Sequence, residues 1–197
     1  MDNKQIRQKI RALRQQKSLA EQQQASTQII THISNSKLYR NAHNIAVFLT
    51  NDNEPDLTPL ITHAWQRGKK CYLPVIGHRF ESRLSFQLYT PDSIMLANRY
   101  GILEPRKCPT SKLTKPWRLD LLLMPLVAFD LTGNRIGMGG GYYDKTLSYR
   151  AYRTKWDKPQ LMGVAYSDQQ VTKIKAEKWD IALDSIATNN KVTVFKR

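Results

Sequence analysis

The chain has 197 residues, and its hydrophobic fraction of 41% is typical of a globular protein and too high for a disordered one. Its polar N-terminus predicts no secretory signal, and the longest apolar run, residues 121–129, is too short for a helix across a bilayer of about 30 Å. A net charge of +15 favours polyanionic ligands, such as nucleotides, polycarboxylates or nucleic acid, although a basic surface can also serve solubility alone. Cys71 and Cys108 form no C-x-x-C pair, so neither a zinc site nor a disulfide framework is indicated, and a cytoplasmic location is expected.

The N-terminal segment predicts two helices. Ile6, Ile10 and Leu13 recur at helical spacing among many Lys and Arg residues, which indicates an amphipathic helix with a basic face over about the first 17 residues. Residues 18–21, Ser-Leu-Ala-Glu, have the pattern of a capping box, in which a Ser and a Glu side chain cap the first turn. A second helix is therefore expected from there to about Ile33.

A strand–helix–strand unit is predicted next. Residues 44–49 are a short apolar run of strand formers, and residues 51–53 form a polar turn. Thr58 and Pro59 suit the N-cap and first position of a helix that ends near Gly68. Residues 69–74 predict the second strand. This order is typical of a parallel sheet.

The second half of the chain adds further strands and one helix. Further strands are predicted at residues 84–89, 119–129, 161–166, 185–188 and 192–195, a turn at 130–134, and a helix from 143 to about 149. Together the elements predict an α/β protein: a single domain over residues 1–197, built as a three-layer α/β/α sandwich with a mostly parallel sheet.

Four glycines lie within five positions, at 137, 139, 140 and 141, between a predicted strand and a predicted helix. This layout is typical of a phosphate-binding site, because glycine lets the backbone approach closely and the exposed N–H groups attract anions. Arg135 and Lys145 flank the loop and add positive charge. The loop is neither a Walker A loop nor a G-x-G-x-x-G fingerprint, and a purely structural turn is the alternative.

Three residues after the glycines have two interpretations each. Asp144 either complements the helix dipole or helps to hold Mg²⁺. Of Tyr142 and Tyr143, we expect one to stack on a planar ligand and the other to pack in the core, because consecutive helical residues point in different directions.

The strings PLVAFD at residues 125–130 and GNRIGMGGGYYD at residues 133–144 closely resemble the signature of the 5-formyltetrahydrofolate cyclo-ligase family, also called 5,10-methenyltetrahydrofolate synthetases. Residues 4–7 (KQIR), 101–105 (GILEP) and 179–188 (WDIALDSIAT) resemble further elements of that family, and Phe48-Leu49 followed by Glu54 resembles its folate-binding stretch. The resemblance covers almost the whole chain. Departures from the family's pattern are Asn3, Leu57 and Trp179, where Lys, Thr and His are common.

The resemblance implies an ATP- and Mg²⁺-dependent ligase that converts 5-formyltetrahydrofolate to 5,10-methenyltetrahydrofolate with release of ADP and phosphate. The formyl oxygen would be phosphorylated and the ring closed by N10, with no acid, base or nucleophile assigned to the protein. The implied ATP-binding residues are Lys4, Arg7, Arg135, Gly137, Met138, Gly139, Gly140, Gly141, Tyr142, Tyr143, Asp144 and Lys145. The implied folate-binding residues are Leu49, Glu54, Gly141, Tyr142 and Tyr143, and the implied metal-binding residues are Asp144 and Asp180.

The expected partner is therefore a small-molecule substrate, 5-formyltetrahydrofolate with or without a polyglutamate tail, bound by a monomer without nucleic acid or membrane. One competing hypothesis is a basic RNA-binding protein. Its stacking aromatic residues are missing from the first 38 residues, where the basic arm would lie. The other is a different ATP-dependent ligase or kinase on a similar fold.

Overall fold

The computed structural model describes residues 2–77, 82–106, 114–152 and 158–195. Its central sheet contains β1 (Asn44–Ala46), β2 (Lys70–Ile76), β3 (Leu84–Tyr89), β6 (Leu121–Pro125), β9 (Gln160–Val164), β10 (Ser185–Ala187) and β11 (Val192–Val194). The strand order is β11-β10-β9-β6-β1-β2-β3. The inner strands pair in parallel, whereas β3 and β11 at the two edges are antiparallel to their neighbours. The predicted, mostly parallel sheet is confirmed.

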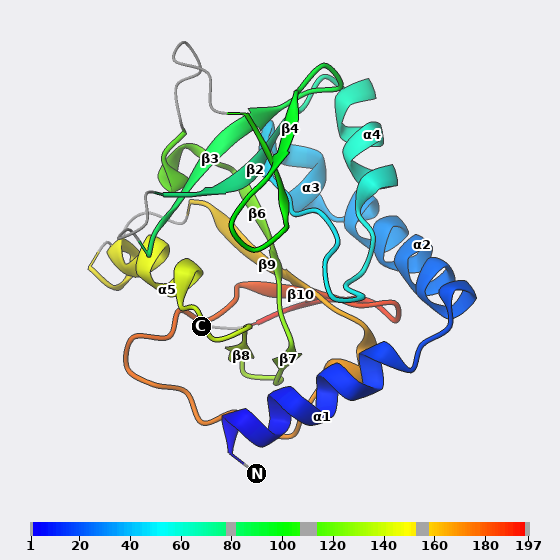
Figure 1. Ribbon diagram of the computed structural model, residues 1–197, viewed down its shortest axis with the longest axis vertical. Coiled ribbons are helices and arrows are strands. Elements are labelled where there is room, and N and C mark those ends of the chain that lie inside the picture. The colour runs from blue at the N-terminus through cyan, green and yellow to red at the C-terminus, as the bar shows by residue number, and fades with distance from the viewer. Residues whose placement is uncertain (1, 78–81, 107–113, 153–157, 196–197) are drawn as a thin grey trace.

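Helices cover both faces of this sheet (Figure 1). On one face lie α2 (Leu19–Asn35), α3 (Lys37–Asn41) and α4 (Thr58–Gln66), and on the other lies α5 (Tyr142–Leu147). Strand β6 shows why two faces must be covered. Leu121 and Leu123 pack into the cluster beneath α2 and α4, while Leu122 and Met124 pack into the cluster beneath α5. The three-layer architecture is confirmed.

The first helix, α1 (Asn3–Gln15), crosses the lower end of the molecule in Figure 1, against a small hairpin of β7 (Ala128–Phe129) and β8 (Arg135–Ile136). Ile6 and Ile10 are buried on this hairpin, as predicted. The third buried residue of α1 is Arg14, whereas Leu13 is 39% exposed. The expectation that Leu13 continues the apolar stripe was therefore wrong.

The strand expected over residues 119–129 is two strands in two different sheets. It breaks after Pro125, the last residue of β6, and the Val127 N–H then donates to the Ile136 carbonyl oxygen in the hairpin. The predicted turn at 130–134 joins β7 to β8, where the Asp130 carboxylate accepts hydrogen bonds from the backbone N–H groups of Thr132 and Asn134. The glycine loop consequently follows a hairpin strand, and not a strand of the central sheet.

Several element ends follow the predicted local signals. Ser18 and Glu21 form the expected capping box at the start of α2, and Gly68, with a φ of 68°, lies just beyond α4. The N-cap of α4 is Leu57 rather than Thr58, because the Leu57 carbonyl oxygen accepts the first hydrogen bond of the helix, from the Ile61 N–H. The Asp56 carboxylate accepts hydrogen bonds from the N–H and the hydroxyl of Thr58.

The remaining elements are short. They are the antiparallel pair β4 (Met95–Ala97) and β5 (Leu103–Pro105) and the 3-10 turns Pro116–Arg118, Ser148–Ala151 and Ser167–Gln169. Among the described residues, no helix is both long enough and apolar enough to cross a membrane.

Candidate active site at the carboxyl edge of the sheet

Two segments with predicted site residues leave the central sheet at the same edge. Residues 47–57 follow the carboxyl end of β1, and the β7–β8 hairpin with the glycine loop follows the carboxyl end of β6. These strands are parallel neighbours, so both segments begin side by side. Ligands of open parallel sheets bind at this edge, which makes it the candidate site.

The glycine loop, residues 137–141, has a conformation that depends on its glycines. Gly139 and Gly141 have φ angles of 105° and 63°, which side chains strongly disfavour. At Gly140, a Cβ atom would lie 2.8 Å from two ring carbons of Tyr142, whereas at Gly137 it would meet nothing within 4 Å. The helix that follows the loop has only six residues, so its dipole contributes less than the sequence suggested. The groups that can bind an anion here are therefore the backbone amides of the loop and nearby cationic side chains.

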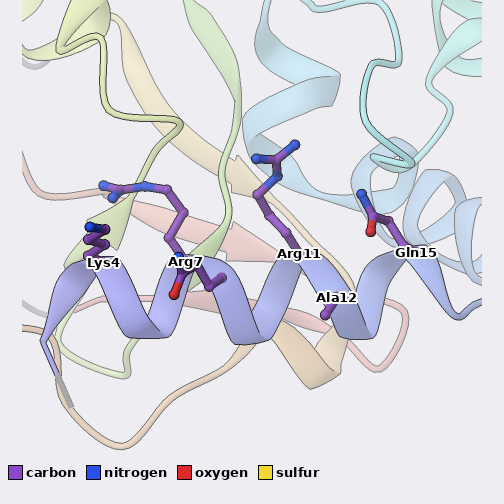
Figure 2. A pocket seen from close by; sticks show the side chains of 6 residues that line it. Lys4, Arg7, Arg11, Ala12 and Gln15 are labelled. Atoms are coloured by element: carbon purple, nitrogen blue, oxygen red, sulfur yellow. The ribbon is translucent and has the colours of Figure 1, made fainter.

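Helix α1 supplies such cations. Arg7 Nε donates a hydrogen bond of 2.9 Å to the Gly137 carbonyl oxygen, and its guanidinium lies 3.9 Å from the Cβ position of Gly139. Figure 2 shows Lys4, Arg7 and Arg11 pointing to the same side of the helix. They line a groove of about 410 Å³ together with Gln8, Ala12 and Gln15. The structure thus brings together the basic helix and the glycine loop, as the phosphate-binding hypothesis requires.

Arg135 and Asp144, at the two ends of the glycine loop, form an ion pair of 2.6 Å. Arg135 is only 6% exposed at its side chain, and its other terminal nitrogen donates to the Ile181 carbonyl oxygen. The Ile181 N–H in turn donates to Asp144 Oδ1. Arg135 and Asp144 therefore brace the loop against the C-terminal segment, a role that sequence reasoning did not foresee. Their predicted roles toward phosphate and metal stay predictions.

The donor set for Mg²⁺ is small. Among the described residues, no group of three or more His, Cys, Asp or Glu side chains is arranged to hold a metal ion. Within the described part of the chain, both hydrogen bonds of Asp144 use Oδ1, and Asp180, next to Ile181, accepts one from the Glu177 N–H. The prediction that Asp144 and Asp180 hold Mg²⁺ therefore stays a prediction, in which phosphate oxygens and water would complete the octahedron of an ion bound by one or two carboxylates.

Glu54 lies in the segment after β1 and is only 8% exposed. Burial raises the pKa of its carboxyl to about 7, although the positive charge of Arg14 and the Asn51 N–H act in the opposite direction. Arg14 Nη1 is 3.9 Å from Glu54 Oε1. A buried carboxyl that titrates near neutral pH is a common property of functional sites.

Tyr143 shares the electrostatic environment of Glu54. Burial raises the pKa of the Tyr143 phenol above its usual range, the Glu54 charge raises it further, and Arg135 lowers it. Tyr142 and Tyr143 are both partly buried and both pack against the cluster beneath α5, so the expected division of roles between the two tyrosines stays a prediction. Leu49 is partly buried against the cluster beneath α2 and α4.

Sequence reasoning missed Arg99 and Tyr100, in the loop between β4 and β5. Arg99 Nη2 donates to the Tyr142 hydroxyl at 2.7 Å, and the hydroxyls of Tyr100 and Tyr142 share a hydrogen bond of 2.8 Å. Asn98 shapes this loop by accepting hydrogen bonds from the Tyr100 and Ile102 N–H groups. The adjacent string at residues 101–105 was the available signal, because it marked this loop as part of the family's pattern.

The geometry agrees with comparisons to known proteins. The model of the 5-formyltetrahydrofolate cyclo-ligase family matches residues 1–189. The chain belongs to this family. It is 42% identical to the 5-formyltetrahydrofolate cyclo-ligase of Escherichia coli K12 over 188 residues, covering 95% of this chain and 98% of that protein. The corresponding protein of Haemophilus influenzae is 39% identical, with 92% and 95% covered. The resemblance inferred from the glycine-loop signature is confirmed.

Solved structures give the same assignment. The NMR structure of Aquifex aeolicus 5,10-methenyltetrahydrofolate synthetase superposes on this cyclo-ligase family member with a TM-score of 0.82 at 28% identity, covering 100% of this chain and 94% of that one. A synthetase structure from Mycoplasma pneumoniae has a TM-score of 0.75 at 21% identity, with 96% and 99% covered, and supports the fold.

Proposed function

We propose that this cyclo-ligase family member converts 5-formyltetrahydrofolate and ATP to 5,10-methenyltetrahydrofolate, ADP and phosphate between α1, the glycine loop and Glu54. The observation that carries this proposal is the hydrogen bond from Arg7 to Gly137, two residues 130 positions apart. It joins the basic helix to the loop whose signature defines the family. A phosphate-binding surface thereby lies at the carboxyl edge of the sheet, where Glu54 is also found.

The triphosphate would be held by charge and by backbone amides. Lys4 and Arg7 on α1 line the groove, and Arg7 also contacts the glycine loop, so the amides of residues 137–141, Met138 among them, would add hydrogen-bond donors to the triphosphate. Lys145, in the last turn of α5, is exposed and lies 3.9 Å from the Cβ position of Gly141, so it can add a further charge. Positioning and neutralising phosphate charge is the main task of a protein in phosphoryl transfer.

The pterin of the folate would be recognised by Glu54. A carboxylate acceptor suits the N–H groups of a pterin ring, and the burial of Glu54 shields these hydrogen bonds from water. Leu49 and Tyr142 would pack against the flat ring, with Gly141 and Tyr143 beside it. The loop would then present the γ-phosphate of ATP to the formyl group.

The chemistry needs activation of an unreactive group. A formamide carbon is a poor electrophile and its oxygen a poor leaving group, and transfer of the γ-phosphoryl group to that oxygen removes both obstacles. N10 then attacks the formyl carbon, the carbon–oxygen bond breaks, and phosphate leaves as the ring closes. Bound Mg²⁺ would supply charge neutralisation at the phosphates, with Asp144 and Asp180 as its protein ligands. The protein's own residues bind, orient and exclude water.

We further propose that the enzyme is a cytoplasmic monomer and that its positive charge attracts ATP and the glutamate tail of folate. The alternative of an RNA-binding arm on α1 is less compatible with the side chains. Arg11 is engaged with Asp52 of the same chain, and Arg14 is buried.

The test is a coupled measurement of both products. Purified protein, ATP, Mg²⁺ and 5-formyltetrahydrofolate should give the near-ultraviolet absorbance of the methenyl product, with one ADP formed for each methenyl group. Omission of ATP should abolish the signal. ATP turnover that does not depend on the folate, or the absence of methenyl product at any enzyme concentration, would assign the site to another ligase or kinase.

A further inference from the structure

Arg14 is a buried arginine that the proposed chemistry does not use. Its exposure is 1%, and it continues the stripe of Ile6 and Ile10 by which α1 packs on the protein. An apolar side chain is the usual occupant of such a position, since burying a guanidinium without partners is very costly. The partners of Arg14 therefore indicate the role of its guanidinium charge.

Two of those partners, Asp52 and Glu54, belong to the segment after β1. Arg14 Nη2 forms an ion pair with Asp52 Oδ2, and Nη1 lies 3.4 Å from the Leu126 carbonyl oxygen and 3.9 Å from Glu54 Oε1. Arg11, one turn earlier on α1, binds both oxygens of the Asp52 carboxylate at 2.9 and 3.1 Å. Two arginines of one helix thus hold a single carboxylate two positions before Glu54.

The backbone of this segment makes a tight turn. Asp52 and Asn53 have φ angles of 51° and 55°, in the left-handed region, which Asp and Asn adopt more readily than other residues with side chains. The charged groups around Glu54 are Arg14 on α1 and Asp52 in its own loop, and the titratable but uncharged phenol of Tyr143 on α5 also faces it. Arg14 supplies the positive charge of this set, which holds the carboxylate form of a buried acid in place.

We propose that Arg14 is a positioning residue that ties the Glu54 loop, residues 51–54, to the helix whose other half contacts the glycine loop. This proposal rests on the proposed function, which places ATP next to Arg7 and the folate next to Glu54. Arg7 and Arg14 are seven residues apart, which is about 10 Å along a helix axis. A nucleotide that orders α1 through Arg7 therefore also orders the folate loop through Arg14, so each substrate raises the affinity for the other.

The experiment compares Arg14→Met with a matched control, Lys17→Met. Lys17 lies just beyond the C-terminus of α1 and pairs with Asp168 at 2.5 Å, and not with a carboxylate of the Glu54 loop. The readouts are hydrogen exchange of residues 50–57 and the dissociation constants of 5-formyltetrahydrofolate and of a non-hydrolysable ATP analogue, each alone and together. Arg14→Met should speed exchange in residues 50–57 and weaken folate binding about tenfold, or about 1.4 kcal/mol. Binding of the ATP analogue alone should change less than about twofold, and its enhancement of folate binding should disappear.

Two results would overturn the proposal. One is unchanged folate affinity and unchanged exchange in Arg14→Met. The other is a parallel loss of both affinities with lower stability, as expected of a merely structural residue. If Arg14→Met does not fold, Arg14→Lys takes its place, because lysine keeps the charge but not the two-point contact. Equal folate binding by Arg14→Lys and the wild type would then count against the proposal. A wild type that binds no 5-formyltetrahydrofolate would refute the proposed function instead, and the exchange measurement would still test Arg14.

Discussion

Replacing Gly140 by alanine should damage catalysis far more than folding. Gly140 does not have a left-handed φ, so alanine is compatible with its backbone. The new Cβ atom would lie 2.8 Å from the Cδ2 and Cε2 atoms of the Tyr142 ring, against about 3.5–4.0 Å for an ordinary carbon contact. The ring must therefore move, although its hydroxyl is held by Arg99 and Tyr100.

The position of the displaced Tyr142 ring determines the expected changes in the free energy of unfolding and in kcat/KM. Gly140 is exposed and Tyr142 is partly exposed, so the displaced hydroxyl can bond to water and the free energy of unfolding should change by less than about 1 kcal/mol. Returning the ring to its place for substrate binding would restore the steric overlap, which costs about 1–3 kcal/mol. That free energy corresponds to a loss of about 5- to 150-fold in kcat/KM.

The assay is the rate of methenyl formation, with urea unfolding of the same preparations. Gly137→Ala is the matched control, because its Cβ atom meets nothing within 4 Å and its φ is not left-handed. The control should lose less kcat/KM than Gly140→Ala, because it adds no steric overlap and keeps the carbonyl oxygen that accepts from Arg7. Wild-type kcat/KM in Gly140→Ala would refute the argued role of the Tyr142 ring. An unfolded Gly140→Ala protein would show that the loop is a structural turn.

Three further predictions concern pH, packing and charge. Because burial raises the pKa of Glu54 from 4.5 to about 7, the folded state binds this proton more tightly than the unfolded chain, and stability should fall as pH rises through that window. Glu54→Gln should remove this dependence in urea unfolding at about pH 5 and about pH 8, and an unchanged dependence would contradict it. Gly163→Ala places a Cβ atom 2.7 Å from three buried side chains and should lower the free energy of unfolding by about 1–3 kcal/mol, with kcat retained. Finally, kcat/KM should fall as salt rises, because the net charge of +15 steers anionic substrates, and a salt-independent value would exclude steering.

The fold was largely predictable because its signals are local. The capping box of Ser18 and Glu21 and the positive φ of Gly68 depend on a few neighbouring residues, and the structure has α2 and α4 where they indicate. The division of residues 119–129 was not predictable from apolar character. A run of buried residues looks the same whether it continues in one sheet or, as after Pro125, turns into a separate hairpin.

The residues of the candidate site also fall into a predictable and an unpredictable group. The glycine loop was identified from consecutive residues, and the structure adds the cation of Arg7 to it. The contacts of Arg14 and Arg135 were not predictable, because their partners Asp52 and Ile181 lie 38 and 46 positions away in the sequence. Helical spacing puts Arg14 on the face of Ile6 and Ile10, but its charge predicts exposure to solvent, and only the folded chain shows the carboxylate that allows its burial.

The most direct test of the account follows the oxygen atom of the formyl group. The proposed reaction transfers the γ-phosphoryl group to that oxygen, so 5-formyltetrahydrofolate labelled with ¹⁸O in the formyl group should yield inorganic phosphate carrying the label. Mass spectrometry of the phosphate, with unlabelled folate in ¹⁸O-water as the control, measures this transfer. Label in the phosphate from the formyl group, and none from water, is the predicted result. Label from water alone would mean that ATP is hydrolysed without activating the folate, and the central claim would be wrong.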